Sequence, residues 1–249
     1  MQTLTAPRLL SVEEILELLT PEFAEFFTPG GGGGLPFHLF RHPLYYDVTM
    51  MGTELEIQRA LISVAKKSEL VEQCNKEERF SSVIFLHERP WRLNAFIRFG
   101  PGFLEHPTPR KLRTYWKLFG EIWTDSENHW QALDDWKGLL RVLDSRPIMT
   151  RHVMLPEERA WLKELQEGGE NIELFRGVNP DHETTRNPGI SWTTNLETAR
   201  WFSSRLSRKD RPSVFKTTVP TDQLLLAFTR RNESELVIKP SFKLKAKRV

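Results

Sequence analysis

The residue pattern of the chain changes after Gly168-Gly169, and this change constrains the fold more than any other feature of the sequence. Before these glycines, apolar residues recur at roughly helical spacing, and helix-capping residues stand ahead of them. After them come short, β-branched runs of strand length, separated by turn residues. The sequence therefore predicts an α+β protein, with a mainly helical region over residues 1–168 and a smaller region of strands and one helix over residues 169–249.

Local signals place the individual elements. Ser11 and Thr53 are each followed by a Glu three residues later, which is the capping box of a helix start, and Asn195 is a good N-cap. The expected helices cover residues 11–19, 53–74, 109–123, 129–143, 156–167 and 196–206. The expected strands cover residues 83–86, 172–175, 189–194, 214–219, 224–228 and 236–238. Residues 92–99 fit a helix or a strand equally well, and the sequence GPG that follows them predicts a turn.

Four tryptophans lie seven, seven and six residues apart within the helical region. They are Trp116, Trp123, Trp130 and Trp136. This spacing suits one face of a helix or a pair of packed helices, so we predict that these side chains form core rather than a platform for bases.

Several classes of protein are excluded by composition. The lone Cys74 rules out a disulfide framework and multi-cysteine metal sites, and the seven histidines lack metal-ligand spacing. No run approaches the roughly 18 apolar residues that span a bilayer. Acidic residues interrupt the first apolar run, which argues against a signal peptide. We therefore expect a cytoplasmic protein with no metal and no membrane contact.

The formal net charge of +2 conceals an uneven distribution. From Arg200 to the end, 13 Lys and Arg stand against four Asp and Glu, so the remainder of the chain is acidic overall. The chain ends in KLKAKRV. Such an end is either a solvated tail or a landing surface for a polyanion such as RNA or DNA, and charge alone leaves both interpretations open.

Three short motifs in the second region carry polar side chains suited to chemistry. Arg176 ends a predicted strand and precedes Gly177, where a guanidinium can clamp a phosphate and glycine allows close approach to the backbone. In the next strand, alternation places Ser191 and Thr193 on one face. Each motif alone fits a surface residue or a half-buried strand equally well.

The third motif is a pair of acids, Glu233 and Glu235, at the entry to the last predicted strand. Two carboxylates two residues apart share one face of a strand and repel each other unless a cation lies near. Exposed acids of this kind can simply protect a sheet edge. Alternatively, one acts on a substrate while the other positions a second reactant.

Taken in order on successive strands, these motifs resemble the mono-ADP-ribosyltransferase superfamily, in its arginine–serine–glutamate branch of toxin-like bacterial and phage enzymes. The resemblance covers roughly residues 172–240 and includes the Ala-Arg-Trp-Phe stretch at 199–202. It implies a split pair of antiparallel sheets packed face to face, with NAD in the cleft between them. The family pattern Ser-Thr-Ser is altered here, because Trp192 and Thr193 follow Ser191.

The resemblance also implies roles for individual residues. Glu235 would be the catalytic acid that grips a ribose hydroxyl, Ser191 would support it, and Glu233 would position and deprotonate the acceptor. Contacts to NAD would come from Arg176, Gly177 and Thr193. Independently of the resemblance, Trp201 and Phe202 on the predicted helix fit either core positions, which are commoner for such residues, or the nicotinamide side of the cleft. Acceptor recognition would fall to Arg230, Arg231 and Asn232.

The implied reaction consumes NAD as a substrate, releases nicotinamide and transfers ADP-ribose to a macromolecular acceptor. A Glu-x-Glu pair goes with protein arginine in the family, whereas the basic end of this chain favours RNA or DNA. The resemblance also implies an intracellular toxin or effector, for which an inhibitor or antitoxin protein is a conceivable partner. Residues 1–168 would cover the cleft or recognise the target. The alternatives are an NAD glycohydrolase, with water as acceptor, and a non-catalytic RNA- or protein-binding adaptor.

Overall fold

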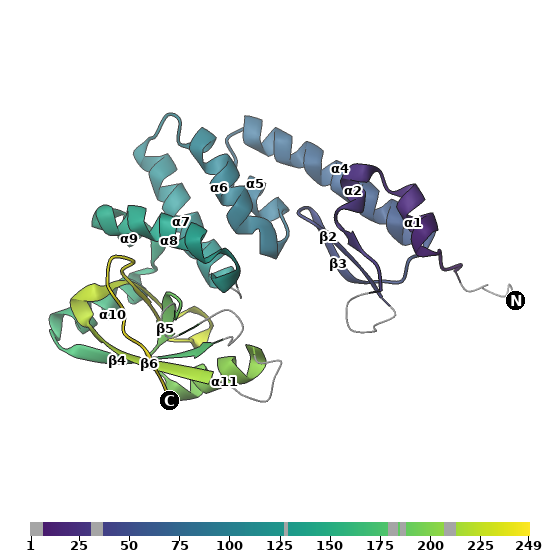
Figure 1. Cartoon of the computed structure of the whole chain (residues 1–249). Coiled ribbons are helices and arrows are strands. Elements are labelled where there is room, and N and C mark those ends of the chain that lie inside the picture. Colours follow the sequence, from purple (N-terminus) through teal and green to yellow (C-terminus); the bar gives the residue numbers. More distant parts are fainter. Residues whose placement is uncertain (1–6, 31–36, 127–128, 179–183, 185–187, 207–212) are drawn as a thin grey trace, which may run out of the picture. The chain divides into compact units, whose positions relative to one another are not determined.

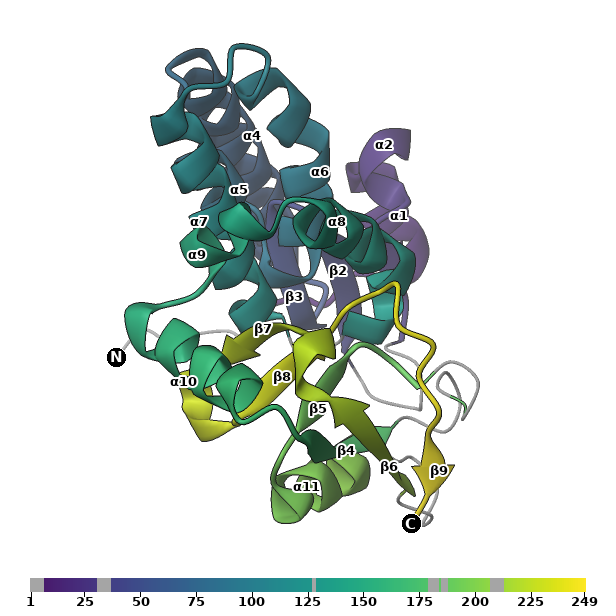
Figure 2. The same cartoon turned by 90° about the vertical axis from the view of Figure 1, so that its left-hand side faces the viewer.

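The computed structural model of the chain describes residues 7–30, 37–126, 129–178, 184, 188–206 and 213–249, and all of their side chains except those of Trp130, Leu206 and Asn232. Helices and antiparallel sheets are both present, so the protein is α+β (Figures 1 and 2). The chain divides into two compact units, Met1–Thr108 and Pro109–Val249. The division precedes the boundary expected after residue 168, because α9 and α10 pack against the strand β7 (Leu224–Phe228) of the second unit.

The first unit combines helices with a small sheet. Its helices are α1 (Val12–Leu18), α2 (Pro21–Ala24), α4 (Glu54–Lys76), α5 (Phe80–Leu86), the 3₁₀ turn η1 (Arg89–Trp91) and α6 (Arg92–Phe103). Its strands β1 (Phe27–Thr28), β2 (His38–His42) and β3 (Tyr45–Met50) pair antiparallel in that order. The capping boxes at Ser11 and Thr53 are present as predicted. Ile15, Phe40, Met50 and Ile57 are buried together where α1 and α4 meet the sheet.

Two predictions in this unit are wrong. Residues 83–86 belong to helix α5, not to a strand, because the run is too short for periodicity to separate a strand from a buried helix. Val83 and Ile84 are fully buried in this helix, which packs on α4 and α6. The GPG sequence lies inside α6 rather than in a turn, with Pro101 near the end of the helix.

The second unit places helices before and between the strands of a larger sheet. Its helices are α7 (Pro109–Asp125), α8 (Leu133–Ser145), α9 (Thr150–Val153), α10 (Pro156–Glu167) and α11 (Leu196–Leu206), with 3₁₀ turns η2 (His129–Ala132), η3 (Pro147–Met149), η4 (Thr221–Gln223) and η5 (Arg230–Asn232). Its strands are β4 (Asn171–Val178), β5 (Ser191–Thr193), β6 (Ser213–Pro220), β7, β8 (Glu235–Ile238) and β9 (Lys247–Arg248). The five strands and the helix predicted after Gly169 are therefore confirmed, and Asn195 caps α11 through its side-chain oxygen.

The sheet of this unit has the strand order β7-β8-β5-β4-β6-β9, and every neighbouring pair is antiparallel (Figure 2). β4 pairs with β6 along its whole length, but among the described residues it meets β5 only at Phe175 and Thr193. Hydrogen bonding thus defines one sheet with a narrow centre, not the two separate sheets that the resemblance implies.

The basic end of the chain is docked on this sheet. Lys247 and Arg248 pair with β6, the Thr217 hydroxyl donates to the Lys245 carbonyl at 2.9 Å, and the Val249 N–H donates to Val214 at 3.0 Å. Lys245 and Lys247 remain exposed to solvent. The end is therefore a bound edge strand that presents lysines outward, rather than a loose tail.

Close packing of α11 on β4 depends on Gly177. A Cβ at this position would lie 2.2 Å from the Ala199 carbonyl oxygen and 2.5 Å from the Ser203 nitrogen, both backbone atoms that cannot turn aside. We expect Gly177→Ala to destabilise the protein by about 1–3 kcal/mol through overpacking. Gly138→Ala is the control, because a Cβ there meets nothing within 4 Å in helix α8. It should stabilise the fold by about 0.5–1 kcal/mol.

Urea unfolding of the two glycine variants and the wild-type protein measures both effects. Equal stability of Gly177→Ala and the wild-type protein would show that α11 can move away from β4 at no cost.

Candidate functional site

The three motifs of the second region meet in one pocket, at the narrow centre of the sheet. β4 contributes Arg176 and Gly177, β5 contributes Ser191 and Thr193, and Glu235 enters from β8. The empty space is about 820 Å³, part of which is open to solvent. This size is typical of sites for small molecules and cofactors.

Glu235 is the centre of a hydrogen-bonded chain in the pocket. The Ser191 hydroxyl donates to Oε1 of Glu235, and the indole Nε1 of Trp123 donates to the same oxygen at 3.0 Å. Arg176 lies one step further away, because its Nη1 donates to the Ser191 carbonyl oxygen at 2.6 Å. Arginine, serine and glutamate, separated in the sequence, are thus linked directly in the fold.

Removal of the Glu235 carboxylate from water raises its pKa to about 7. The neighbouring carboxylate of Glu233 adds to this rise. Hydrogen bonds from Ser191 and Trp123 and the positive charge of Arg176 act in the opposite direction, because they favour the ionised form. A carboxyl group with a pKa this far from its ordinary value, in a pocket, is typical of functional sites.

His129 lies against the indole of Trp123 and also lines the pocket. The two ring centroids are 4.2 Å apart, and Nε2 of His129 is 3.1 Å from the Trp123 carbonyl oxygen, to which it donates. Burial, together with the positive charges of Arg176 and Arg231, lowers the pKa of His129 to about 3. The imidazole is therefore neutral at physiological pH.

The segment that carries Glu233 has an unusual backbone. Arg231 and Ser234, on either side of Glu233, have φ values of 65° and 45°, in the left-handed region that non-glycine residues rarely adopt. The Thr193 hydroxyl donates to the Glu233 carbonyl at 2.9 Å, and Nε of Arg231 lies 3.6 Å from the Glu233 carboxylate. Backbone strain of this kind concentrates at functional sites.

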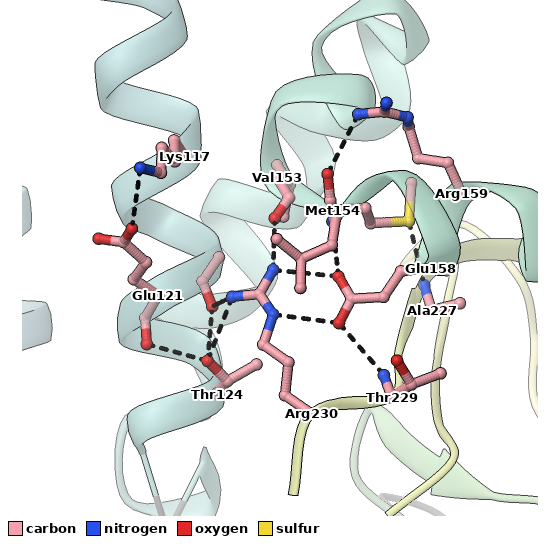
Figure 3. A network of polar contacts seen from close by, with 12 residues as sticks. Lys117, Glu121, Thr124, Val153, Met154, Glu158, Arg159, Ala227, Thr229 and Arg230 are labelled. Carbon is pink, nitrogen blue, oxygen red and sulfur yellow. Dashed lines mark hydrogen bonds and ion pairs between the residues drawn. The ribbon is translucent and has the colours of Figure 1, made fainter. Parts of the chain in front are cut away.

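Arg230 was predicted to recognise an acceptor, and its contacts show another use (Figure 3). Its Nε and Nη2 both lie 3.0 Å from the carboxylate of Glu158, whose side chain is fully buried. The remaining N–H groups point to carbonyl or hydroxyl oxygens of Gly120, Thr124 and Val153. All five guanidinium donors are thus engaged within the protein.

Glu158 also accepts hydrogen bonds from the backbone N–H groups of Leu155 and Thr229. The pair therefore fastens the segment after β7 to α7, α9 and α10. Arg230 also lines the pocket, so acceptor recognition by Arg230 stays a prediction beside this structural role.

Some of the other predicted site residues line the pocket and others lie outside its lining. Phe202 lines the pocket, whereas Trp201 lies outside the lining, is 55% exposed and packs under the guanidinium of Arg205. Arg231 lines the pocket on the side of Glu233, and the side chain of Asn232 falls outside the described part of the chain.

Trp123 and His129 are site residues that sequence reasoning missed. The core prediction holds for Trp116, Trp123 and Trp136, which are all at most 5% exposed, while the side chain of Trp130 is not among those described. Trp123, however, also donates to Glu235. No local signal separates it from the other tryptophans, because its partner lies more than a hundred residues away in the sequence.

No protein-family model, curated protein or solved structure matches the chain. Within the described residues, no three His, Cys, Asp or Glu side chains gather as metal ligands would. No helix of the described part combines the length and the apolar character needed to cross a bilayer.

Proposed function

We propose that the protein is an NAD-dependent mono-ADP-ribosyltransferase. The observation that carries this proposal is the linked chain Arg176–Ser191–Glu235, because these are the residue types, in the order, on which the resemblance to that superfamily rests. The pocket is large enough for part of a dinucleotide, and it lies where β4 and β5 share a single backbone pair among the described residues.

The chemistry follows from the polar groups in the pocket. Cleavage of the bond between ribose and nicotinamide develops positive charge on the ribose, as in glycoside hydrolysis, and an ionised carboxylate at Glu235 stabilises that charge. Nicotinamide leaves as a neutral molecule and needs no general acid. Glu233 then accepts the proton of the attacking nucleophile. Arg176 supplies positive charge for the phosphates of NAD.

Two observations bear on the acceptor. The guanidinium of Arg231 already lies 3.6 Å from Glu233, where a protein arginine would have to bind. The docked basic strand presents lysines that suit a phosphodiester backbone. Both favour RNA or DNA over protein arginine as the acceptor.

The test is to incubate the purified protein with a cell lysate and NAD labelled in its adenylate part. We expect a labelled macromolecule, and treatment of separate samples with protease and nuclease identifies its class. Loss of the label with nuclease supports a nucleic-acid acceptor, whereas loss with protease supports a protein acceptor. Release of nicotinamide without any labelled macromolecule would favour the glycohydrolase alternative. Absence of NAD binding in calorimetry, together with salt-dependent RNA binding, would favour an adaptor.

A further inference from the structure

The two oxygens of the Glu235 carboxylate have different surroundings. Oε1 accepts from both the Ser191 hydroxyl and the Trp123 indole. These are the hydrogen bonds of the Glu235 side chain within the described part of the chain, and both end on Oε1 rather than Oε2. Two donors on one oxygen fix the plane of the carboxylate and leave the other oxygen for a ligand in the pocket.

Trp123 is held rigidly enough to act as such a donor. Its side chain is completely buried, and its ring lies 6.1 Å from Phe228 of β7 in a stacked arrangement and 5.0 Å from Trp136 of α8 in an edge-on one. The His129 ring covers a further side at 4.2 Å. A ring enclosed by aromatic neighbours from three other segments cannot turn its N–H away from Glu235 without disturbing all of them.

We propose that Trp123, which lies in α7 and outside the three sequence motifs, is a positioning residue that directs Oε2 of Glu235 toward the ribose of the substrate. The inference rests on the proposed function for its substrate, but its structural part does not depend on turnover. The groups facing the Glu235 carboxylate are Ser191 from β5, Trp123 from α7, the guanidinium of Arg176 from β4 and the carboxylate of Glu233.

The structural part is tested by NMR of the eight indole N–H groups in the full-length protein. The resonance of Trp123, identified by its loss in Trp123→Phe, should shift as Glu235 ionises, with a midpoint near the pKa of about 7. In Glu235→Gln this shift should be absent. A Trp123 resonance that does not titrate, or that titrates equally in Glu235→Gln, would overturn the inference.

The kinetic part compares Trp123→Phe with Trp116→Phe in an assay of nicotinamide release. Trp123→Phe keeps an aromatic ring but removes the N–H, so we expect kcat at neutral pH to fall about 10²-fold with little change in KM. The pKa of Glu235 should rise, because a donor to its ionised form is lost, and the pH–rate profile should move to higher pH. Trp116→Phe removes a buried indole of the same helix that packs on Tyr115 and Phe119, and its pH–rate profile should match that of the wild-type protein.

The outcomes separate the two proposals. An unchanged pH–rate profile in Trp123→Phe would overturn the positioning role. If the wild-type protein releases no nicotinamide, the proposed function fails. The NMR titration still tests the hydrogen bond from Trp123 to Glu235. Should Trp123→Phe not fold, comparison of the indole resonances of the wild-type protein and Glu235→Gln remains decisive, since one resonance should titrate in the first and none in the second.

Discussion

Replacement of Glu235 by Gln is expected to lower nicotinamide release from NAD by at least about 10²–10³-fold. The amide has nearly the shape of the carboxyl group but cannot carry the negative charge that stabilises the ribose cation. Ser191 and Trp123 both donate to this side chain, and the amide oxygen can still accept from them. Loss of activity would therefore reflect the missing charge rather than a rearranged pocket. The measurement is the rate of nicotinamide release at saturating NAD.

The matched control is Glu233→Gln, two residues earlier on the same segment. If Glu233 serves the acceptor, this change should reduce transfer of ADP-ribose more than it reduces release of nicotinamide. Glu235→Gln should reduce both reactions together. Equal effects of the two substitutions on release would contradict the division of roles between the two acids.

The raised pKa of Glu235 also predicts how the stability of Glu235→Gln compares with that of the wild-type protein as pH changes. Because the folded pKa of about 7 exceeds the ordinary value of 4.5, the folded state binds more protons between these pH values than the unfolded state does. The contribution of Glu235 to stability is therefore lost as pH rises through this window, and the ionised group is unfavourable above it. Glu235→Gln should accordingly be at least as stable as the wild-type protein at pH 8. Activity of the wild-type protein should rise through pH 7 as the carboxylate forms.

Glu158→Gln is expected to destabilise the protein by about 3–5 kcal/mol, because it leaves the guanidinium of Arg230 largely buried without its counter-charge. Glu158 is fully buried and receives hydrogen bonds from Arg230, Leu155 and Thr229. Removal of its charge weakens all of these at once. Urea denaturation gives the free energy of unfolding, and the midpoint should fall without a large change in slope.

Glu157→Gln provides the control for this change. Glu157 is the preceding residue of α10 and is exposed, so its replacement should alter stability by no more than about 0.5 kcal/mol. Replacement of both Glu158 and Arg230 by Met should recover much of the lost stability, because no buried charge then remains. If the double variant is as unstable as Glu158→Gln, packing around the pair rather than its charge is the dominant factor.

The sequence was most informative where local chemistry decides the structure. Capping residues placed α1, α4 and α11 correctly, and the β-branched runs after Gly169 placed the strands of the larger sheet. It failed for α5, where a short apolar run fits either structure, and for the small sheet β1-β2-β3, whose strands are short and carry mixed polar side chains. Tertiary packing decides both cases.

The candidate site shows the same limit. The order of the three motifs, through the family resemblance that it gave, predicted that Arg176, Ser191 and Glu235 belong together, and they line one pocket. The structural role of Arg230 was missed because its partner Glu158 lies in a helix 72 residues earlier. The roles of Trp123 and Trp201 were likewise out of reach, since both are aromatic residues on helices and only the fold separates the buried one from the exposed one.

The narrow centre of the sheet is important both for the stability of the sheet and for the candidate site, because the junction between β4 and β5 lines the pocket. β4 and β5 share one backbone pair among the described residues, and the hydrogen bond from Arg176 to the Ser191 carbonyl joins the same two strands. The side chain proposed to bind phosphate therefore also holds two halves of the sheet together. Substitutions of Arg176 should not be interpreted from activity alone, because a weaker junction between β4 and β5 and a lost phosphate contact would both reduce turnover. Only a measurement of stability alongside the kinetics distinguishes them.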